Sequence, residues 1–384
     1  MARPKVILVA NDVVPGMGMP VAAPGLRVFG LGAGLREHGF RVSTVVMADA
    51  VRAAWSGRVP PPLPPATRVI EPKELGRLAA GEAPAVVVLT NSNHIDDLRP
   101  APGLRLIVDL FAPKMLELAC RVGGGEHRRA LDELRERKLR AIGAADGLIF
   151  NGPRKRAYFL SWLLAAGRDP LTTPLEPVFM CLPSRFPGER PPGSAVRFSV
   201  AGYRQAWSLP GPWLEQLAAR LDPPRVTLDL IVPAHWGEGD APCPEPAVVE
   251  TVRRRPGVTT HPALRYGDFL DLMAGIDVAV DLFEHTLERE YAVVTRTVVA
   301  LACGVPVVHP PFTEVSPLIA AYDAGWLVDA GDRDRLGGVL DEILGSPEVM
   351  AAKAANARRL WGEVLDPLVA VRPLADMIER LAAG

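Results

Sequence analysis

The segment YAVVTRTVVALACGVPVV, residues 291–308, places a threonine and an arginine at the start of an apolar-periodic run. Thr295 is a good helix N-cap residue, and Gly304 is placed to end that helix ahead of a buried strand. The free N–H groups of a first helical turn attract anions, and Arg296 adds a fixed positive charge beside them. The pattern therefore predicts a diphosphate site formed by Thr295, Arg296 and Thr297. The alternative is a capped core helix with a surface arginine.

An alternation of strands and helices must position this site. Short apolar runs rich in β-branched residues recur along the chain, separated by stretches of helical periodicity. The predicted strands cover residues 5–10, 40–46, 85–90, 104–110, 146–151, 196–202, 226–232, 257–261, 277–283, 305–310 and 325–330. The predicted helices include 126–144, 211–221, 266–275, 295–303, 333–345 and 347–361. Because the strands lack apolar–polar alternation, we predict an α/β fold whose parallel sheets are covered by helices on both faces. Such sheets bind ligands at the carboxyl ends of their strands.

The chain is predicted to form two doubly wound, Rossmann-like domains. Its 384 residues exceed the usual size of a single domain. A Pro/Gly-rich stretch without periodicity, at 182–195, has the composition of a linker. We therefore place the first domain at 1–185 and the second at 186–365. The last periodic segment, 366–384, is predicted to return to the first domain.

Charge and cysteine content argue against several function classes. Lys plus Arg number 43 and Asp plus Glu number 44, whereas a nucleic acid or an anionic membrane would select a basic face. The four cysteines form no CxxC pair or His/Cys cluster, so neither a disulfide framework nor a zinc site is indicated. No run approaches the roughly 18 to 20 apolar residues of a transmembrane helix. We expect a cytoplasmic protein and leave peripheral membrane contact open.

The run VALACGVPVV, residues 299–308, resembles a motif of a known enzyme family. In retaining glycosyltransferases of the GT-B fold, the large family that includes sucrose and glycogen synthases, an E-x7-E motif leads into EALACGVPVV. This chain is similar to that pattern, with Tyr291 and Val299 at the places of the two glutamates.

A second run, LEREYAVVTRT at 287–297, resembles one bacterial branch of that family, found in polysaccharide and natural-product gene clusters. The branch carries a pattern like LETRFSFRTRVLDYLWAGLPVV. Five residues of that pattern are kept here: Glu288, Thr295, Arg296, Gly304 and Pro306. DLFAPKMLE at 109–117 and the segment 23–46 resemble the same branch, so the resemblance touches both domains.

The resemblance implies a GT-B architecture, in which two Rossmann-like domains face each other across a cleft. It implies transfer of a sugar from a nucleotide-diphosphate sugar to a small-molecule or glycan acceptor, with retention at the anomeric carbon. It implies no cofactor and no required metal ion. The first turn of the helix and Arg296 would then stabilise the charge that develops on the departing diphosphate.

Val299 is the main departure from the family, because the glutamate at its place usually holds the ribose hydroxyls of the nucleotide. Losing a charged acceptor costs on the order of 1.5 to 3 kcal/mol per hydrogen bond. Glu288, our candidate catalytic carboxylate, and Glu290 lie in the preceding loop and are the candidates to compensate. Either one is equally well explained as a solvated charge.

Two further segments of the second domain are candidate donor contacts. Arg204 follows a predicted strand at the place where relatives hold a basic residue against the diphosphate, and the alternative is a surface arginine. The lysine common in relatives a few positions later is missing. Ala263 and Leu264 lie where relatives read the base with backbone groups.

The first domain offers candidates for the acceptor side. His94 follows a predicted strand and would orient a sugar hydroxyl, unless it is an ordinary loop residue. Asp109 takes the place of a family histidine. It would accept the acceptor's proton or bond a sugar hydroxyl, or instead cap the following helix. Gly25 and Arg27 begin a helix where relatives admit the acceptor and phosphate. The loop at 15–27 lacks GxGxxG spacing, which disfavours an NAD enzyme.

Two rival functions share this architecture. One is a nucleotide-sugar epimerase or a pseudo-glycosyltransferase that forms a non-glycosidic bond. The other is a degenerate, non-catalytic homologue that binds a nucleotide as an accessory, which Val299 and the missing lysine favour.

Overall fold

The computed structural model describes residues 3–55, 61–120, 125–188, 195–236 and 243–383. The chain divides into two compact units. Unit 1 comprises Met1–Pro183 and Leu365–Gly384, and unit 2 comprises Ser184–Val364. The boundaries predicted from the sequence, after residues 185 and 365, lie near these divisions. Part of the predicted linker, at 189–194, falls outside the described residues.

In the described part of unit 1, a seven-stranded sheet has the order β3-β2-β1-β4-β5-β6-β7. Every neighbouring pair in it is parallel. The strands are β1 (Lys5–Ala10), β2 (Arg41–Met47), β3 (Thr67–Ile70), β4 (Ala85–Thr90), β5 (Leu104–Leu110), β6 (Gly147–Phe150) and β7 (Leu175–Pro177). The order reverses between β1 and β4, and open α/β sheets bind ligands beyond the carboxyl ends of the strands at such a switch point.

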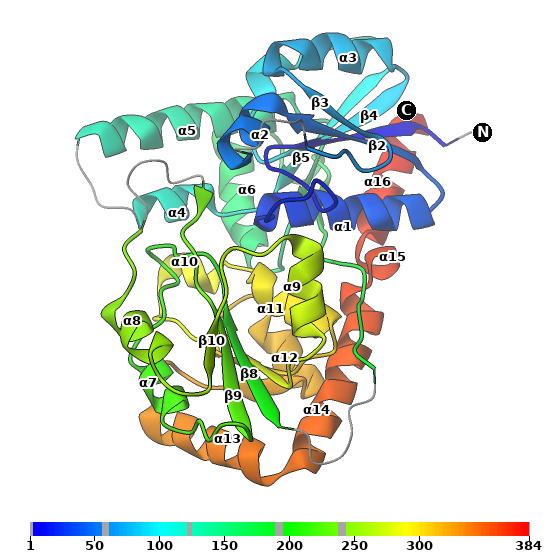
Figure 1. Cartoon of the computed structure of the whole chain (residues 1–384). Coiled ribbons are helices and arrows are strands. Elements are labelled where there is room, and N and C mark those ends of the chain that lie inside the picture. The colour runs from blue at the N-terminus through cyan, green and yellow to red at the C-terminus, as the bar shows by residue number, and fades with distance from the viewer. Residues whose placement is uncertain (1–2, 56–60, 121–124, 189–194, 237–242, 384) are drawn as a thin grey trace. The chain divides into compact units, whose positions relative to one another are not determined.

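The helices of unit 1 come from both ends of the chain. They are α1 (Ala23–Glu37), α2 (Ala48–Ala54), α3 (Leu75–Gly81), α4 (Lys114–Ala119), α5 (Gly125–Ala144), α6 (Lys155–Ala165), α15 (Pro367–Ala370) and α16 (Arg372–Ala383). The last two, red in Figure 1, belong to unit 1, and α15 packs on α1. Gly34 permits this packing, because a Cβ there would lie 2.2 Å from the carbonyl oxygen of Pro367.

Unit 2 repeats the same sheet order with six strands among its described residues, β10-β9-β8-β11-β12-β13, and all pairs are again parallel. The strands are β8 (Val196–Ala201), β9 (Val226–Ile231), β10 (Val258–Thr260), β11 (Val278–Val280), β12 (Val307–His309) and β13 (Gly325–Leu327). The switch point of this sheet lies between β8 and β11.

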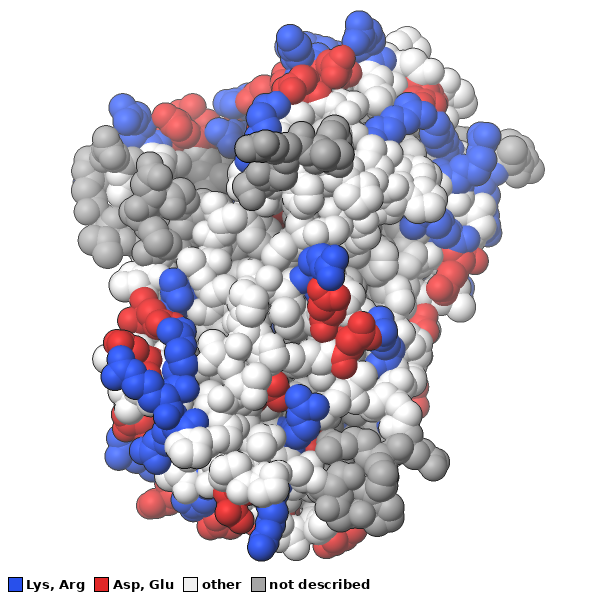
Figure 2. Space-filling view, in the orientation of Figure 1, with Lys and Arg blue, Asp and Glu red and all other residues white. Residues whose placement is uncertain are grey.

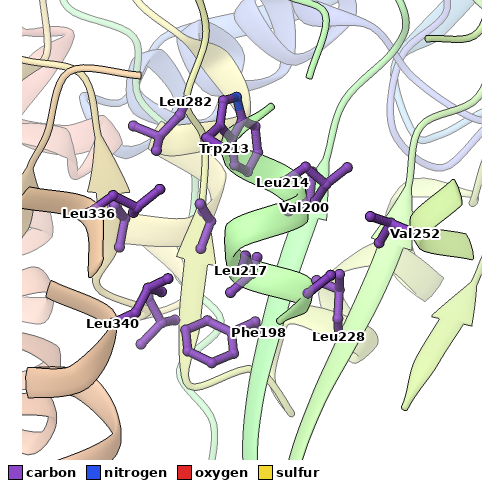
Figure 3. Packing of buried hydrophobic residues seen from close by; sticks show 14 of the residues in the cluster. Phe198, Val200, Trp213, Leu214, Leu217, Leu228, Val252, Leu282, Leu336 and Leu340 are labelled. Carbon is purple, nitrogen blue, oxygen red and sulfur yellow. The ribbon is translucent and has the colours of Figure 1, made fainter. Parts of the chain in front are cut away.

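Helices cover this second sheet and close its core. They are α7 (Trp213–Ala218), α8 (Ala247–Arg253), α9 (Tyr266–Met273), α10 (Leu287–Glu290), α11 (Thr295–Ala302), α12 (Ser316–Tyr322), α13 (Arg333–Gly345) and α14 (Pro347–Leu360). Figure 3 shows side chains of α7, β8 and α13 packing together in this core: Leu214, Leu217, Phe198, Leu336 and Leu340. Their burial fixes the strands whose carboxyl ends carry the candidate site.

Two strands, β3 and β7, were not predicted. Both lie at edges of the unit 1 sheet and are only four and three residues long. The residues of β3 are exposed or half-buried, so the strand lacks the apolar run that marks the central strands.

The surface carries both signs of charge. On the face shown in Figure 2, basic and acidic side chains are interspersed, as the near balance of charged residues leads one to expect. Among the described residues, no helix has the length and apolar character needed to cross a membrane.

Candidate functional site

Helix α11 begins one residue earlier than the predicted cap implies. Val294 occupies the N-cap position, no side chain caps the helix, and Thr295 is its first residue. The cap predicted at Thr295 is therefore wrong. The physical reason is that Val294 is buried with Ala292 and Phe283 in a small apolar cluster. Burial of this residue, rather than a hydrogen bond from a side-chain hydroxyl, therefore fixes where the helix begins.

A buried carboxylate, Asp281, lies next to the start of α11. It directly follows β11 and accepts hydrogen bonds at 2.6 Å from Nε of Arg296 and at 2.6 Å from Oγ1 of Thr297. Burial alone would raise the pKa of Asp281, but the charge of Arg296 and these hydrogen bonds hold it below its usual value. Asp281 is thus a fixed anion that orients both residues.

The same contacts continue to a fully buried histidine, His309, at the end of β12. Its Nδ1 lies 3.2 Å from Oγ1 of Thr297, and its Nε2 lies 2.8 Å from Oγ1 of Thr313. Burial lowers the pKa of His309 to about 4, so the ring is neutral at pH 7. Because the Thr297 hydroxyl donates to Asp281, its oxygen accepts from His309, which places the ring proton on Nδ1.

The guanidinium of Arg296 also lies against the loop that follows β8. A Cβ at Gly202, whose φ is +143°, would lie 2.2 Å from Nη1 of Arg296. Only a glycine allows this approach. Arg296 therefore lies at the switch point between β8 and β11, and its side chain is only 20% exposed. The alternative of a surface arginine is wrong for Arg296.

Val299 and Glu288 are both buried. Val299 is 2% exposed, inside α11. Both carboxylate oxygens of Glu288 accept from the guanidinium of Arg289, with Arg289 Nη2 2.7 Å from Oε1. Glu288 is therefore not a solvated charge, and each of its oxygens already accepts a hydrogen bond. Glu290 is more exposed and lies 2.7 Å from the ring of His285.

Arg204 is held by its own unit. Its Nε donates to the carbonyl of Cys243 at 3.0 Å, and its Nη1 donates to the carbonyl of Val232 at 3.1 Å. Glu245 lies 3.6 Å away and also pairs with Arg253. With a side chain only 16% exposed, Arg204 is not a surface arginine either.

A pocket of about 340 Å³ opens beside Arg204, at the carboxyl ends of β9 and β10. The residues that line it are Arg204, Leu230, Val232, Pro233, Arg253, Thr260, His261 and Pro262. Ala263 and Leu264 follow directly, in the loop between β10 and α9. Arg204, Ala263 and Leu264 thus lie beyond the carboxyl ends of strands of one sheet.

In unit 1, Asp109 and Arg27 form a fully buried ion pair. Nε of Arg27 lies 2.8 Å from Oδ2 of Asp109 and Nη2 lies 3.2 Å from Oδ1, and both side chains are 0% exposed. Asp109 lies within β5 and does not cap α4. The pair has a structural role, and the roles predicted for these two residues, proton acceptor and acceptor or phosphate contact, stay predictions. Neither charge tolerates burial without the other.

The remaining candidates of unit 1 are Gly25, in the first turn of α1, and His94, in the loop after β4. Gly25 allows α1 to approach the loop after β1, since a Cβ there would lie 1.8 Å from the carbonyl oxygen of Val13. His94 adopts a left-handed backbone with φ of +61°. Its Nδ1 lies 3.2 Å from Oδ2 of Asp97, and its side chain is 13% exposed.

Sequence patterns missed the partners of the predicted residues. Asp281 lies inside the predicted strand DVAVDLF, and a second acid in an otherwise apolar run was the available signal. Among the described residues, no group of three or more His, Cys, Asp and Glu is arranged to hold a metal ion.

No protein-family model matches the sequence, and no curated protein matches it. Solved structures do match. Sucrose-phosphate synthase from Thermosynechococcus elongatus is 14% identical over 99% of this chain and 100% of its own, with a TM-score of 0.68. Anabaena HepE, solved with UDP and glucose, is 14% identical over 98% of this chain and 100% of its own, with a TM-score of 0.63. WaaG, a glycosyltransferase involved in lipopolysaccharide biosynthesis, is 16% identical over 97% and 99%, with a TM-score of 0.60. The chain therefore has the GT-B fold of these structures, and the fold class predicted from its sequence is confirmed.

Proposed function

We propose that this protein transfers a sugar from a nucleotide-diphosphate sugar to a hydroxyl group of a small molecule or glycan, with retention and without a required metal ion. The observation that carries the proposal is the position of Arg296 and the start of α11 at the switch point of the unit 2 sheet. HepE, which has the same fold, was solved with UDP and glucose, and also with UDP-glucose.

The start of α11 suits a diphosphate. The first N–H groups of a helix, here those of Thr295, Arg296 and Thr297, have no partner within the helix and attract anions. Asp281 holds Arg296 in one orientation, which removes the entropic cost of ordering it when the ligand binds. The carboxylate of Asp281 offsets part of the charge of Arg296. We therefore expect the peptide dipoles and free N–H groups at the start of α11 to contribute a large share of the attraction for the diphosphate.

The pocket beside Arg204 suits the nucleoside. Its volume of about 340 Å³ lies in the range of small-molecule sites. Ala263 and Leu264 directly follow Pro262, which lines the pocket. We assign recognition of the base to the backbone groups of these two residues. Val299 offers the ribose no hydrogen bond and Glu288 is paired with Arg289, so we assign the ribose contacts to backbone groups as well. His94 remains our candidate to orient a sugar hydroxyl.

A thermal-shift screen of the full chain against UDP, GDP, dTDP, ADP and their sugars tests the donor site. A ligand at 100 times its dissociation constant adds about 2.7 kcal/mol of stability. We expect one nucleotide diphosphate to raise the melting temperature by several degrees. No shift with any of them would contradict the donor site.

A non-catalytic nucleotide-binding accessory is the second candidate, because Val299 is apolar and the carboxylate of Glu288 is already paired. Release of nucleotide diphosphate that depends on an added acceptor would support transfer. Binding without any such release would favour the accessory. Interconversion of the donor sugar without an acceptor would favour the epimerase.

A further inference from the structure

A network of polar side chains is buried behind the start of α11 in unit 2, with His309 at its centre. Its members follow β11, lie in α11, end β12 and lead into α12, and none is more than 6% exposed. Side chains buried this deeply must fill their contacts mainly with their own hydrogens. We call the following residues the His309 network: Asp281, Thr297, His309, Thr313 and Ser316.

Five contacts run in sequence through the His309 network. The first three join neighbours in this order: Asp281, Thr297, His309 and Thr313. In the fourth, Oγ1 of Thr313 lies 2.8 Å from Oγ of Ser316. In the fifth, Oγ of Ser316 lies 2.7 Å from the main-chain carbonyl oxygen of Pro310. Each contact needs one hydrogen, and neither the carboxylate at one end nor the carbonyl at the other can donate one.

With a neutral ring, the network holds one hydrogen too few. The hydroxyls of Thr297, Thr313 and Ser316 supply one each, and a neutral imidazole supplies one more. Because the ring proton is on Nδ1, Thr313 must donate to Nε2 of His309. The hydroxyl of Ser316 can then fill only one of its two contacts. Either Thr313 and Ser316, or Ser316 and Pro310, therefore bring two oxygens together without a hydrogen between them.

A second proton on the ring fills all five contacts. Nδ1 of His309 then donates to Thr297, and Nε2 donates to Thr313. The hydroxyl of Thr313 is released to donate to Ser316, which keeps its hydrogen bond to the carbonyl of Pro310. The geometry thus fits the charged ring better than the neutral one.

The charge of the ring depends on groups from several segments. Burial has the largest effect and lowers the pKa of His309 to about 4. The carboxylate of Asp281 opposes this shift, whereas the charges of Arg296 in α11 and Arg289 in α10 add to it. A further acid, Glu314 in the loop after β12, is also buried. The ring is therefore neutral at pH 7, unless another negative charge arrives beside it.

A diphosphate at the start of α11 would bring such a charge. The arginines in α10 and at the start of α11 already have partners, because Arg296 pairs with Asp281 and Arg289 pairs with Glu288. Their carboxylates offset much of the positive charge that the diphosphate would meet. Thr297, which belongs to the first turn of α11, is also the residue that contacts the ring at Nδ1. An anion bound to this turn would raise the pKa of the ring behind it.

We propose that His309 is a positioning residue that takes up one proton from solvent when a diphosphate binds at the start of α11. The proton gives the site a cation and supplies the missing hydrogen, so that the completed network holds Thr297 and the first turn of α11 in place. That the bound anion belongs to a sugar donor rests on the proposed function. The shortage of one hydrogen rests on the network alone.

Nitrogen-15 NMR of the full chain, labelled at histidine, measures this proton directly. Spectra are recorded from about pH 4 to pH 8, without ligand and with whichever of UDP, GDP, dTDP and ADP gives the largest thermal shift. His309→Gln assigns the signal, and His309→Asn does so if the first variant does not fold. We expect the pKa of His309 to be at least about one pH unit higher in the complex. A smaller rise, no change or a fall would overturn the proposal.

The affinity should change with pH through the same proton. If the complex holds one more proton than the free protein, binding tightens as the pH falls toward the pKa of the free ring, about 4. Isothermal titration at pH 5, 6 and 7 compares the wild type with His309→Gln, because the nucleotide's own titration affects both equally. The affinity advantage of the wild type should grow about twofold to tenfold from pH 7 to pH 5. A constant advantage would contradict proton uptake at His309.

Thr313→Val tests the network while keeping the histidine. Valine cannot accept a hydrogen bond from Nε2 of His309, so the ring should gain much less of its pKa rise when the nucleotide binds. A wild-type rise in Thr313→Val would refute the role of the network. His38→Gln, in unit 1, is the matched control, since that ring lies 2.8 Å from the carbonyl oxygen of Leu368 and outside unit 2. It should keep the pH dependence of the wild type.

Inorganic pyrophosphate separates this proposal from the proposed function. If a nucleotide diphosphate stabilises the chain but the pKa of His309 does not rise, the donor site stands and proton uptake fails. If pyrophosphate raises the pKa of His309 but no nucleotide diphosphate stabilises the chain, proton uptake stands and the donor site fails.

Discussion

The carboxylate of Asp281 lies 2.6 Å from Nε of Arg296, at the point where the strand order of the unit 2 sheet reverses. The acid that directly follows β11 thus holds an arginine in the first turn of α11. The arrangement fixes the direction of the guanidinium and lowers the net charge that a diphosphate would meet. Arg296 is therefore both a structural partner and the candidate phosphate ligand.

Arg296→Gln separates these two roles. Glutamine keeps a donor for Asp281 but loses the positive charge, so we expect weaker binding of the nucleotide diphosphate and little change for the bare nucleoside. A charged hydrogen bond contributes about 1.5 to 3 kcal/mol, which corresponds to roughly a 10- to 150-fold change in affinity. Isothermal titration with UDP and uridine measures both, or with the diphosphate and nucleoside that the screen selects.

The matched control is Arg265→Ala, which removes a largely exposed arginine paired with Asp268 at 2.7 Å. It should leave both affinities unchanged. Equal losses for the diphosphate and the nucleoside in Arg296→Gln would count against a phosphate role for Arg296.

Val299→Glu places a carboxylate where the E-x7-E motif that this sequence resembles has its second glutamate. Because Val299 is 2% exposed, an unpaired glutamate there should lower the melting temperature of the free protein. Ribose hydroxyls would then give the carboxylate partners, so we expect a larger thermal shift with the nucleotide than the wild type shows. Val298→Glu, at a neighbouring fully buried position, should lose stability without that gain. The same nucleotide shift in both variants would show that Val299 does not face the ribose.

Lys138 gives the fold a pH dependence. It lies in α5, is 3% exposed, and its Nζ is 4.8 Å from the centre of the Trp162 ring. Burial lowers the pKa of Lys138 to about 7, while the charge of Glu117 opposes this shift and that of Lys114 adds to it. Between pH 7 and about 10.5 the unfolded chain holds a proton that the folded chain has released, so stability should rise with pH over this interval.

Lys138→Met should remove that slope, which has an upper limit of about 1.4 kcal/mol per pH unit. Urea unfolding at pH 7, 8 and 9 measures it. The matched control is Lys353→Met, since Lys353 lies 5.0 Å from the Trp326 ring but also pairs with Asp323. If the unfolding free energies of the wild type and Lys138→Met change in parallel with pH, the neighbouring aromatic rings, such as that of Trp162, keep Lys138 charged in the folded protein.

Local patterns were enough to predict the central strands and the helices α5, α11, α13 and α14, because central strands are continuous apolar runs and these helices are periodic. They were not enough for β3 and β7, whose edge positions require little apolar surface. Nor could they pair Arg27 with Asp109, since that contact depends on how α1 lies on the sheet.

Residues at strand ends show what was missing. Asn11 and Asn91 each follow a predicted strand, so their types and places were visible in the sequence. That these two strands are neighbours was not, because it depends on strand order and register. The same holds for Asp281, which meets Arg296 only because the start of α11 returns to the carboxyl end of β11.

The buried pair of Arg27 and Asp109 gives a test that distinguishes structure from catalysis. Removing one partner, as in Asp109→Leu or Arg27→Met, leaves a buried charge uncompensated and should cost about 3 to 5 kcal/mol of unfolding free energy. The double variant replaces the pair with apolar side chains and should cost less than the sum of the two. Urea unfolding followed by circular dichroism measures all three. In contrast, Asp96→Asn breaks an exposed pair with Arg140 and should leave the unfolding midpoint nearly unchanged, because water screens that contact. If Asp109→Asn unfolds like the wild type yet abolishes sugar transfer, Asp109 would regain the catalytic role that its buried pairing now argues against.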